Sequence, residues 1–128
     1  MLAHQFHEGQ FRRDGTTPYI NHVIRVVANV KARNGTEDEI VVAWLHDLVE
    51  DTTITLAQLL TNFPSRIVDA VDALTHRDGE SYEESIERAK ANPIARNVKI
   101  ADNLANLSDC PTDKQIRKYS KSLQTLMT

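Results

Sequence analysis

The chain has 128 residues, of which 41% are hydrophobic, and its 15 Lys and Arg against 18 Asp and Glu give a formal net charge of −3. A chain of this length can fold as one domain that buries about two thirds of its unfolded surface, without a disulfide or a structural zinc cluster. The negative charge disfavours non-specific binding to a nucleic-acid polymer, and the longest apolar run, at 40–45, is too short to span a membrane.

One cysteine, Cys110, cannot form an internal disulfide, and the N-terminal segment lacks the pattern of a secretory signal. We therefore expect a cytoplasmic protein in which residues 1–128 form a single domain, with no membrane partner. A small anionic ligand would be held by local positive charge, from a metal ion or a few arginines. The sequence does not specify an oligomeric state.

Capping signals and apolar spacing divide the first half of the chain into helices. Residues 2–13 form a short first helix, and Thr17 caps a second one with Pro18 in its first helical position. The second helix has its apolar face at positions 20, 23, 24, 27 and 30. A capping box at 36–39 starts a third helix that continues to 51, and a short helix at 55–62 follows.

The second half of the chain is helical by the same criteria. Ser65 caps a helix, and a capping box at 81–84 opens a charged, largely solvent-facing helix that ends at 91. Pro93 starts a buried helix that carries the polar pair Asp102 and Asn106, and a further capping box at 112–115 starts the terminal helix. No segment alternates with the period of a strand, so we predict an all-α helical bundle.

The most apolar of these helices carries a polar patch. His46, Asp47, Glu50 and Asp51 interrupt the run at 40–51, and residues four apart stack on one helix face. Carboxylates buried beside apolar residues cost several kcal/mol each, by order of magnitude, unless a counter-charge is present. Two interpretations follow: a metal ion bound by the patch, or an exposed helix end whose acidic groups face water.

Three predicted helices contribute ionisable groups within apolar surroundings. These groups are His22 on the second helix, His46 and Asp47 on the third, and Asp102 on the helix that starts at Pro93. Two imidazoles and two carboxylates suit an octahedral first-row divalent ion with positions left for water and substrate. This agreement between three helices favours the metal interpretation.

The order His22, His46-Asp47, Asp102 resembles the H…HD…D signature of HD-domain metal-dependent phosphohydrolases. The stretches HEGQFRRDGTTPYINH (7–22), AWLHDLVEDT (43–52) and KIADNLANL (99–107) are similar to the hydrolase domain of RelA/SpoT homologues, and most closely to the small alarmone hydrolase branch. The resemblance covers nearly the whole chain. It implies an HD-domain helical bundle that removes the 3′-pyrophosphate of (p)ppGpp to give GDP or GTP.

The resemblance also implies a role for individual residues. The ligands of one divalent ion, manganese in the family, would be His22, His46, Asp47 and Asp102. Glu50 and Asp51 match an acidic pair that positions or activates the attacking water. The expected contacts to a small anionic nucleotide substrate are Arg12 and Arg13 with the guanine and phosphates, Asn106 near the ribose, and Tyr119 in the nucleotide pocket.

Two positions depart from the family pattern. Asn103 stands where relatives commonly have a basic residue, and Ala105 where they have a histidine. These departures favour one alternative, an HD phosphohydrolase of the 5′-nucleotidase type that acts on another nucleotide. A second alternative, of a different class, is a non-catalytic module that keeps the metal and senses a nucleotide. The intact Glu50-Asp51 pair argues against the second alternative.

Overall fold

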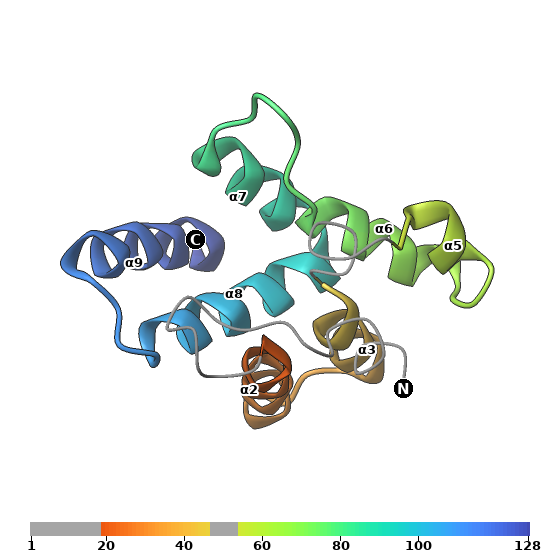
Figure 1. Cartoon of the computed structure of the whole chain (residues 1–128), viewed down its shortest axis with the longest axis horizontal. Coiled ribbons are helices and arrows are strands. Elements are labelled where there is room, and N and C mark those ends of the chain that lie inside the picture. Colours follow the sequence, from red (N-terminus) through yellow and green to blue (C-terminus); the bar gives the residue numbers. More distant parts are fainter. Residues whose placement is uncertain (1–18, 47–53) are drawn as a thin grey trace.

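The computed structural model describes residues 19–46 and 54–128, and this part of the chain forms seven helices. They are α2 (Tyr19–Ala32), α3 (Glu37–Leu45), α5 (Leu56–Leu60), α6 (Ser65–Leu74), α7 (Tyr82–Ala91), α8 (Pro93–Leu107) and α9 (Asp113–Met127). Helix α8 runs through the middle of the bundle and packs against α2, α3, α6, α7 and α9 (Figure 1). The predicted all-α fold is confirmed for the described residues.

Four of these helices begin with a capping box, in which the side chain of the capping residue and that of the third helical residue each bond to the other's backbone N–H. The three predicted boxes, which start at Thr36, Ser81 and Thr112, are present. A fourth, which our sequence analysis did not identify, joins Thr55 to Gln58 and starts α5. The two residues of a capping box are only three positions apart, so the local sequence is enough to predict it.

The predicted start of α6 differs from the structure, whereas the predicted end of α3 is not tested. Ser65 does not cap α6; it is the first helical residue, and Pro64 is the N-cap, whose carbonyl accepts a hydrogen bond from the N–H of Ile67 at 3.0 Å. Helix α3 ends at Leu45 with His46 as its C-cap. Its predicted continuation to 51 lies outside the described residues, as do the predicted first helix at 2–13 and the cap at Thr17.

The buried side chains form two clusters on the two sides of α8. The larger one fills the space between α2, α3, α6 and α8, and includes Val26, Val42, Val71 and Val98, which are all 0% exposed. The smaller one lies between α7, α8 and α9, and consists of Ile86, Ala89, Ile100 and Leu126. Helix α7 is therefore less solvent-facing than predicted, because its Ile86 and Ala89 pack into this second cluster.

The larger core fixes the relative positions of α2, α3 and α8, on which His22, His46 and Asp102 are placed. His22 lies in the first turn of α2, His46 follows the last residue of α3, and Asp102 lies in the second half of α8. Of the helices that the structure describes, none is long and apolar enough to cross a membrane.

Candidate metal centre

His22 points from α2 into the bundle, next to the fully buried Val23 and Val26 of the same helix. The residue is only 5% exposed. Its Nε2 atom lies 2.9 Å from Oδ1 of Asp102, which is eighty residues further along the chain. The packing of α2 against α8 therefore brings an imidazole and a carboxylate into direct contact in the interior.

His46 reaches the same carboxylate from the end of α3. Its Nδ1 atom lies 2.6 Å from the backbone oxygen of Ala43. Because a carbonyl oxygen can only accept, this bond places the ring proton on Nδ1 and leaves a lone pair on Nε2. That Nε2 atom lies 3.6 Å from Oδ1 of Asp102, and the ring centroids of His22 and His46 are 5.9 Å apart.

Asp102 receives these contacts on one oxygen and a lysine on the other. Its Oδ2 atom accepts a hydrogen bond from Nζ of Lys99 at 3.0 Å, and the residue is 6% exposed. Burial by itself would raise the pKa of this carboxyl, but the charge of Lys99 and the hydrogen bond with His22 outweigh it and hold the pKa well below its ordinary value. Asp102 is therefore a carboxylate anion at neutral pH.

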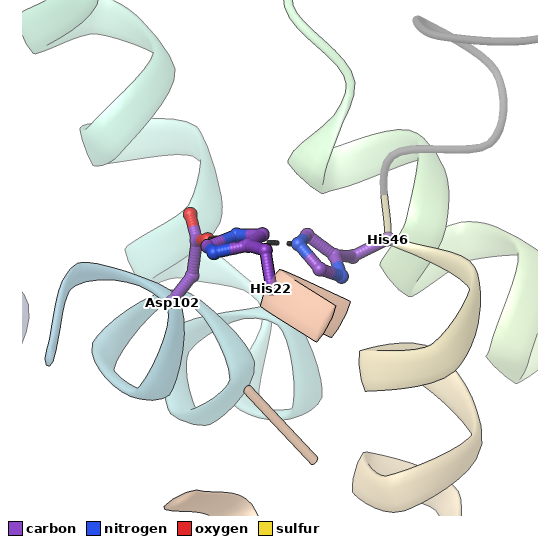
Figure 2. A group of neighbouring side chains, drawn as sticks. All are labelled: His22, His46 and Asp102. Carbon is purple, nitrogen blue, oxygen red and sulfur yellow. Dashed lines mark hydrogen bonds and ion pairs between the residues drawn. The ribbon is translucent and has the colours of Figure 1, made fainter. Parts of the chain in front are cut away.

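The three side chains converge from three elements (Figure 2). One potential ligand atom from each of His22, His46 and Asp102 lies within 4.8 Å of the others. The Nε2 lone pair of His46 and the anionic Oδ1 of Asp102 both face the shared space, and two such acceptors are favourable neighbours when a cation lies between them. The bond from Nδ1 of His46 to Ala43 also fixes the ring as metal-binding histidines require. The residues present therefore fit a divalent ion.

Of the other predicted site residues, the structure describes Asn106 and Tyr119. Asp47, Glu50, Asp51, Arg12 and Arg13 lie outside the described residues. Asn106 is half-buried on α8, one helical turn after Asp102. Tyr119 is half-buried on α9, where its ring centroid lies 5.4 Å from Nζ of Lys118.

Two residues of α8 have partners that the sequence analysis did not assign. Lys99, to which the sequence analysis gave no role, contacts Asp102, and the signal was its position three residues earlier on the same helix. Asn103 is 0% exposed and donates from Nδ2 to Oγ of Ser122 at 2.6 Å, while it accepts from the hydroxyl of Tyr82 at 3.4 Å. Asn103 therefore joins α8 to α7 and α9.

The chain is similar in sequence to known proteins. Residues 1–126 match a family model described as HD domain. The chain is 35% identical to a probable GTP pyrophosphokinase of Mycobacterium leprae, over 98% of this chain and 17% of that protein. It is 37% identical to the guanosine-3′,5′-bis(diphosphate) 3′-pyrophosphohydrolase MESH1 of Mus musculus, over 84% of this chain and 64% of that protein.

A solved structure is also similar along nearly the whole chain. It belongs to a metazoan ortholog of SpoT that hydrolyzes ppGpp, with a TM-score of 0.81 and 28% identity, and the match covers 98% of this chain and 81% of that one. The chain spans less than two thirds of the length of either curated relative described above. The shared helical fold thus corresponds to one part of those longer proteins.

Proposed function

Because the chain belongs to the HD domain family, we propose that it is a metal-dependent hydrolase that removes the 3′-pyrophosphate of guanosine polyphosphates. The products from ppGpp and pppGpp would be GDP and GTP, each with pyrophosphate. The observation that carries the proposal is the buried convergence of His22, His46 and Asp102. The substrate is supported by the 37% identity to a relative named for this activity and by the fold shared with a protein that hydrolyzes ppGpp.

The metal ligands in this proposal are His22, His46, Asp47 and Asp102, and the ion is manganese. When bound, the ion would lower the pKa of a water molecule and neutralise charge on the phosphoryl oxygens. An ion held by these four residues would still have room to bind water and substrate. The low pKa of Asp102 supports this role, because a ligand carboxyl must be deprotonated to bind a cation.

The acidic pair Glu50 and Asp51 supplies the proton transfer in this mechanism. One carboxylate would take a proton from the attacking water as the oxygen bonds to phosphorus, and the bond from phosphorus to the 3′-oxygen would break, with the 3′-oxygen taking up a proton to become a hydroxyl. The sequence supports the assignment, because these residues follow His46 and Asp47 by four. Their charge would also orient the water, since a carboxylate accepts hydrogen bonds from it.

Four further residues bind the nucleotide in this proposal. Arg12 and Arg13 contact the guanine and the phosphates, for which a planar, permanently charged guanidinium is suited. Asn106 contacts the ribose, which agrees with its position one turn after Asp102 on α8. Tyr119 lines the pocket from α9. The partner is thus a small nucleotide, and we expect it to be met in the cytoplasm.

A second candidate function is the hydrolysis of a nucleotide with fewer phosphates. Asn103 of α8 is fully buried against Ser122 of α9, and Ala105 is also 0% exposed. Neither residue supplies the positive charge or the imidazole that relatives commonly have at these positions. A substrate that carries less negative charge, such as a nucleoside monophosphate, would depend less on that missing charge.

The direct experiment incubates the purified protein with ppGpp, manganese and, in a parallel reaction, EDTA. We expect manganese-dependent release of pyrophosphate and GDP, identified by chromatography. His46→Ala should lose this activity, whereas His76→Ala is a matched control, because that histidine is half-exposed in the turn after α6.

The same assay includes nucleoside monophosphates to separate the two candidates. Turnover of a monophosphate by a protein that holds manganese and leaves ppGpp intact would disprove the first function and support the second. Turnover of neither nucleotide by the metal-loaded protein would disprove both.

A further inference from the structure

A cleft lies between α7 and α9, on the opposite side of α8 from the larger core. Its volume is about 350 Å³. Helix α7 contributes Tyr82, Glu83, Ile86 and Glu87 to its walls, and helix α9 contributes Lys118 and Lys121. A cleft of this size accommodates a small molecule or part of one, and its combination of an aromatic ring with charged groups is typical of ligand sites.

The cleft is connected to the metal centre through the ring of Tyr82. Nζ of Lys118 lies 4.2 Å from the centroid of this ring, and Nζ of Lys99 lies 6.0 Å from it. Lys99 in turn contacts Asp102 at 3.0 Å. Two ammonium groups thus flank one aromatic ring, and one of them also contacts a proposed metal ligand. The cleft and the metal centre are therefore linked by a series of side-chain contacts through Tyr82 and Lys99.

Lysines are concentrated on this side of α9. Lys114, Lys118 and Lys121 are four and three residues apart, so they share one face of the helix. Partial burial lowers the pKa of Lys118, and the positive charges of Lys99 and Lys114 lower it further, while Glu83 acts in the opposite direction. Lysines held close enough to repel one another gain free energy when an anion joins them.

Within the lining of the cleft the two glutamates of α7 balance the two lysines of α9 in formal charge, and Lys114, on the same face of α9, leaves an excess of positive charge on this side. Glu83 and Glu87 face the cleft, and Lys99 is shared with Asp102. The chain as a whole is negative, with a net charge of −3, so a local group of lysines is the feature that distinguishes this surface. The molecule that fits carries an anionic group, which the lysines bind, and a second part that contacts the Tyr82 ring. A nucleotide has both, with its phosphate as the anionic group.

We propose that Lys118 and Lys121 form a second anion-binding subsite, which holds the phosphate groups of the substrate that are not hydrolysed. This inference rests on the proposed function, because it assumes a nucleotide with its reacting pyrophosphate at the metal centre. In ppGpp the groups concerned are the 5′-phosphates. The subsite explains how the chain binds a highly charged substrate although Asn103 provides no charge on α8.

The test compares two substrates and a set of lysine variants. The substrates are ppGpp and guanosine 3′-diphosphate, which lacks the 5′-phosphates, and the variants are Lys118→Ala, Lys121→Ala and their combination. For ppGpp we expect KM to rise about tenfold in the double variant, while kcat stays within about twofold. For guanosine 3′-diphosphate we expect the double variant to have the KM of the wild type, because this substrate has no 5′-phosphates for the two lysines to contact.

Two controls isolate the charge contact. Lys118→Arg with Lys121→Arg keeps the positive charge and should restore the wild-type KM, and Lys31→Ala removes an exposed lysine of α2 and should leave KM unchanged. An equal rise in KM for both substrates, or no rise for either, would overturn the subsite.

A binding measurement separates this inference from the proposed function. Inorganic pyrophosphate is titrated into the protein in EDTA by calorimetry, with no turnover required. We expect binding to the wild type that is lost in the double alanine variant and weakens as salt is raised. If ppGpp is not hydrolysed but this result is obtained, the proposed function fails and the anion subsite stands. If the wild type does not bind pyrophosphate, the subsite is overturned.

Discussion

Lys99 and Asp102 form an ion pair on one turn of α8, with Nζ of the lysine 3.0 Å from Oδ2 of the aspartate. The other carboxylate oxygen, Oδ1, faces His22 and His46. The lysine thus occupies one side of the carboxylate and directs the other side toward the histidines. Since Asp102 is almost fully buried, the ion pair also offsets part of the free energy of burying its charge.

The first prediction concerns Lys99→Met, which keeps the length of the side chain and removes its charge. We expect the free energy of unfolding to fall by about 1–3 kcal/mol, because Asp102 would remain buried without its lysine. Urea denaturation in EDTA measures this. Lys99→Arg should retain most of the stability. A Lys99→Met variant as stable as the wild type would show that the ion pair contributes nothing.

The second prediction is a pH dependence of stability that arises from Asp102. Its pKa in the folded protein lies well below the ordinary value of 3.8. Between these two values the unfolded chain binds more protons than the folded one, so stability rises with pH there. The contribution is complete above the ordinary value and is lost as the pH falls toward the folded pKa.

Urea denaturation of the metal-free protein between neutral and acidic pH tests this dependence. The wild type should lose stability on acidification, and Asp102→Asn should lose less over the same interval, because the amide does not titrate. Parallel pH profiles for the two proteins would assign the acid sensitivity to other carboxylates.

Local signals predicted most of the fold. The capping boxes at Thr36, Ser81 and Thr112 involve residues only three apart, so the sequence alone determined where their helices begin. The face of α2 was predicted less well. Ile24 was placed on its apolar face but is 42% exposed, whereas Val26 is 0% exposed. An apolar face that includes Ile24 and one that includes Val26 both have helical spacing, and only the positions of the neighbouring helices decide which face is buried.

The site was predictable in composition but not in its contacts. The order His22, His46, Asp102 identified residues that the structure brings together. The contact between His22 and Asp102 joins residues eighty positions apart, so it depends on the packing of α2 on α8. The burial of Asn103 against Ser122 likewise depends on α9. No local pattern in the sequence specifies either contact.

The third prediction concerns metal binding. A ligand present at about 100 times its dissociation constant stabilises the folded state by about 2.7 kcal/mol, so manganese should raise the melting temperature of the wild type and EDTA should reverse the effect. His46→Ala should abolish the shift, and His76→Ala should preserve it. The quantity compared is the change in melting temperature on adding manganese, because loss of a buried side chain also lowers the melting temperature of the metal-free protein. A full shift in His46→Ala would exclude His46 as a ligand.

The fourth prediction separates catalysis from metal binding. Replacing Glu50 by Gln and Asp51 by Asn removes the proposed proton acceptors with little change in shape. We expect kcat to fall by about 10²–10⁴-fold, the range for loss of general acid and base catalysis, while manganese still raises the melting temperature. Glu37→Gln, an exposed change in the first turn of α3, is the control. Retained turnover in the Glu50 and Asp51 variant would disprove the mechanism.

The fifth prediction concerns the buried bond between Asn103 and Ser122. Asn103→Ala would leave Oγ of Ser122 without this donor in the interior, and we expect a loss of about 1–3 kcal/mol in the free energy of unfolding. Ser122→Ala would have a similar cost. Because the two residues share one bond, the double variant should lose less stability than the sum of the single losses, by about 0.5–3 kcal/mol.

Chemical denaturation of the four proteins gives this coupling free energy, and melting with and without manganese shows whether the metal centre is affected. We expect the manganese shift to persist in all four, since the hydrogen bonds of Asn103 go to Tyr82 on α7 and Ser122 on α9. If the two losses of stability are additive, the hydrogen bond between Asn103 and Ser122 contributes no net stability. Loss of the manganese shift in Asn103→Ala would instead show that α9 holds Asp102 in position through Asn103.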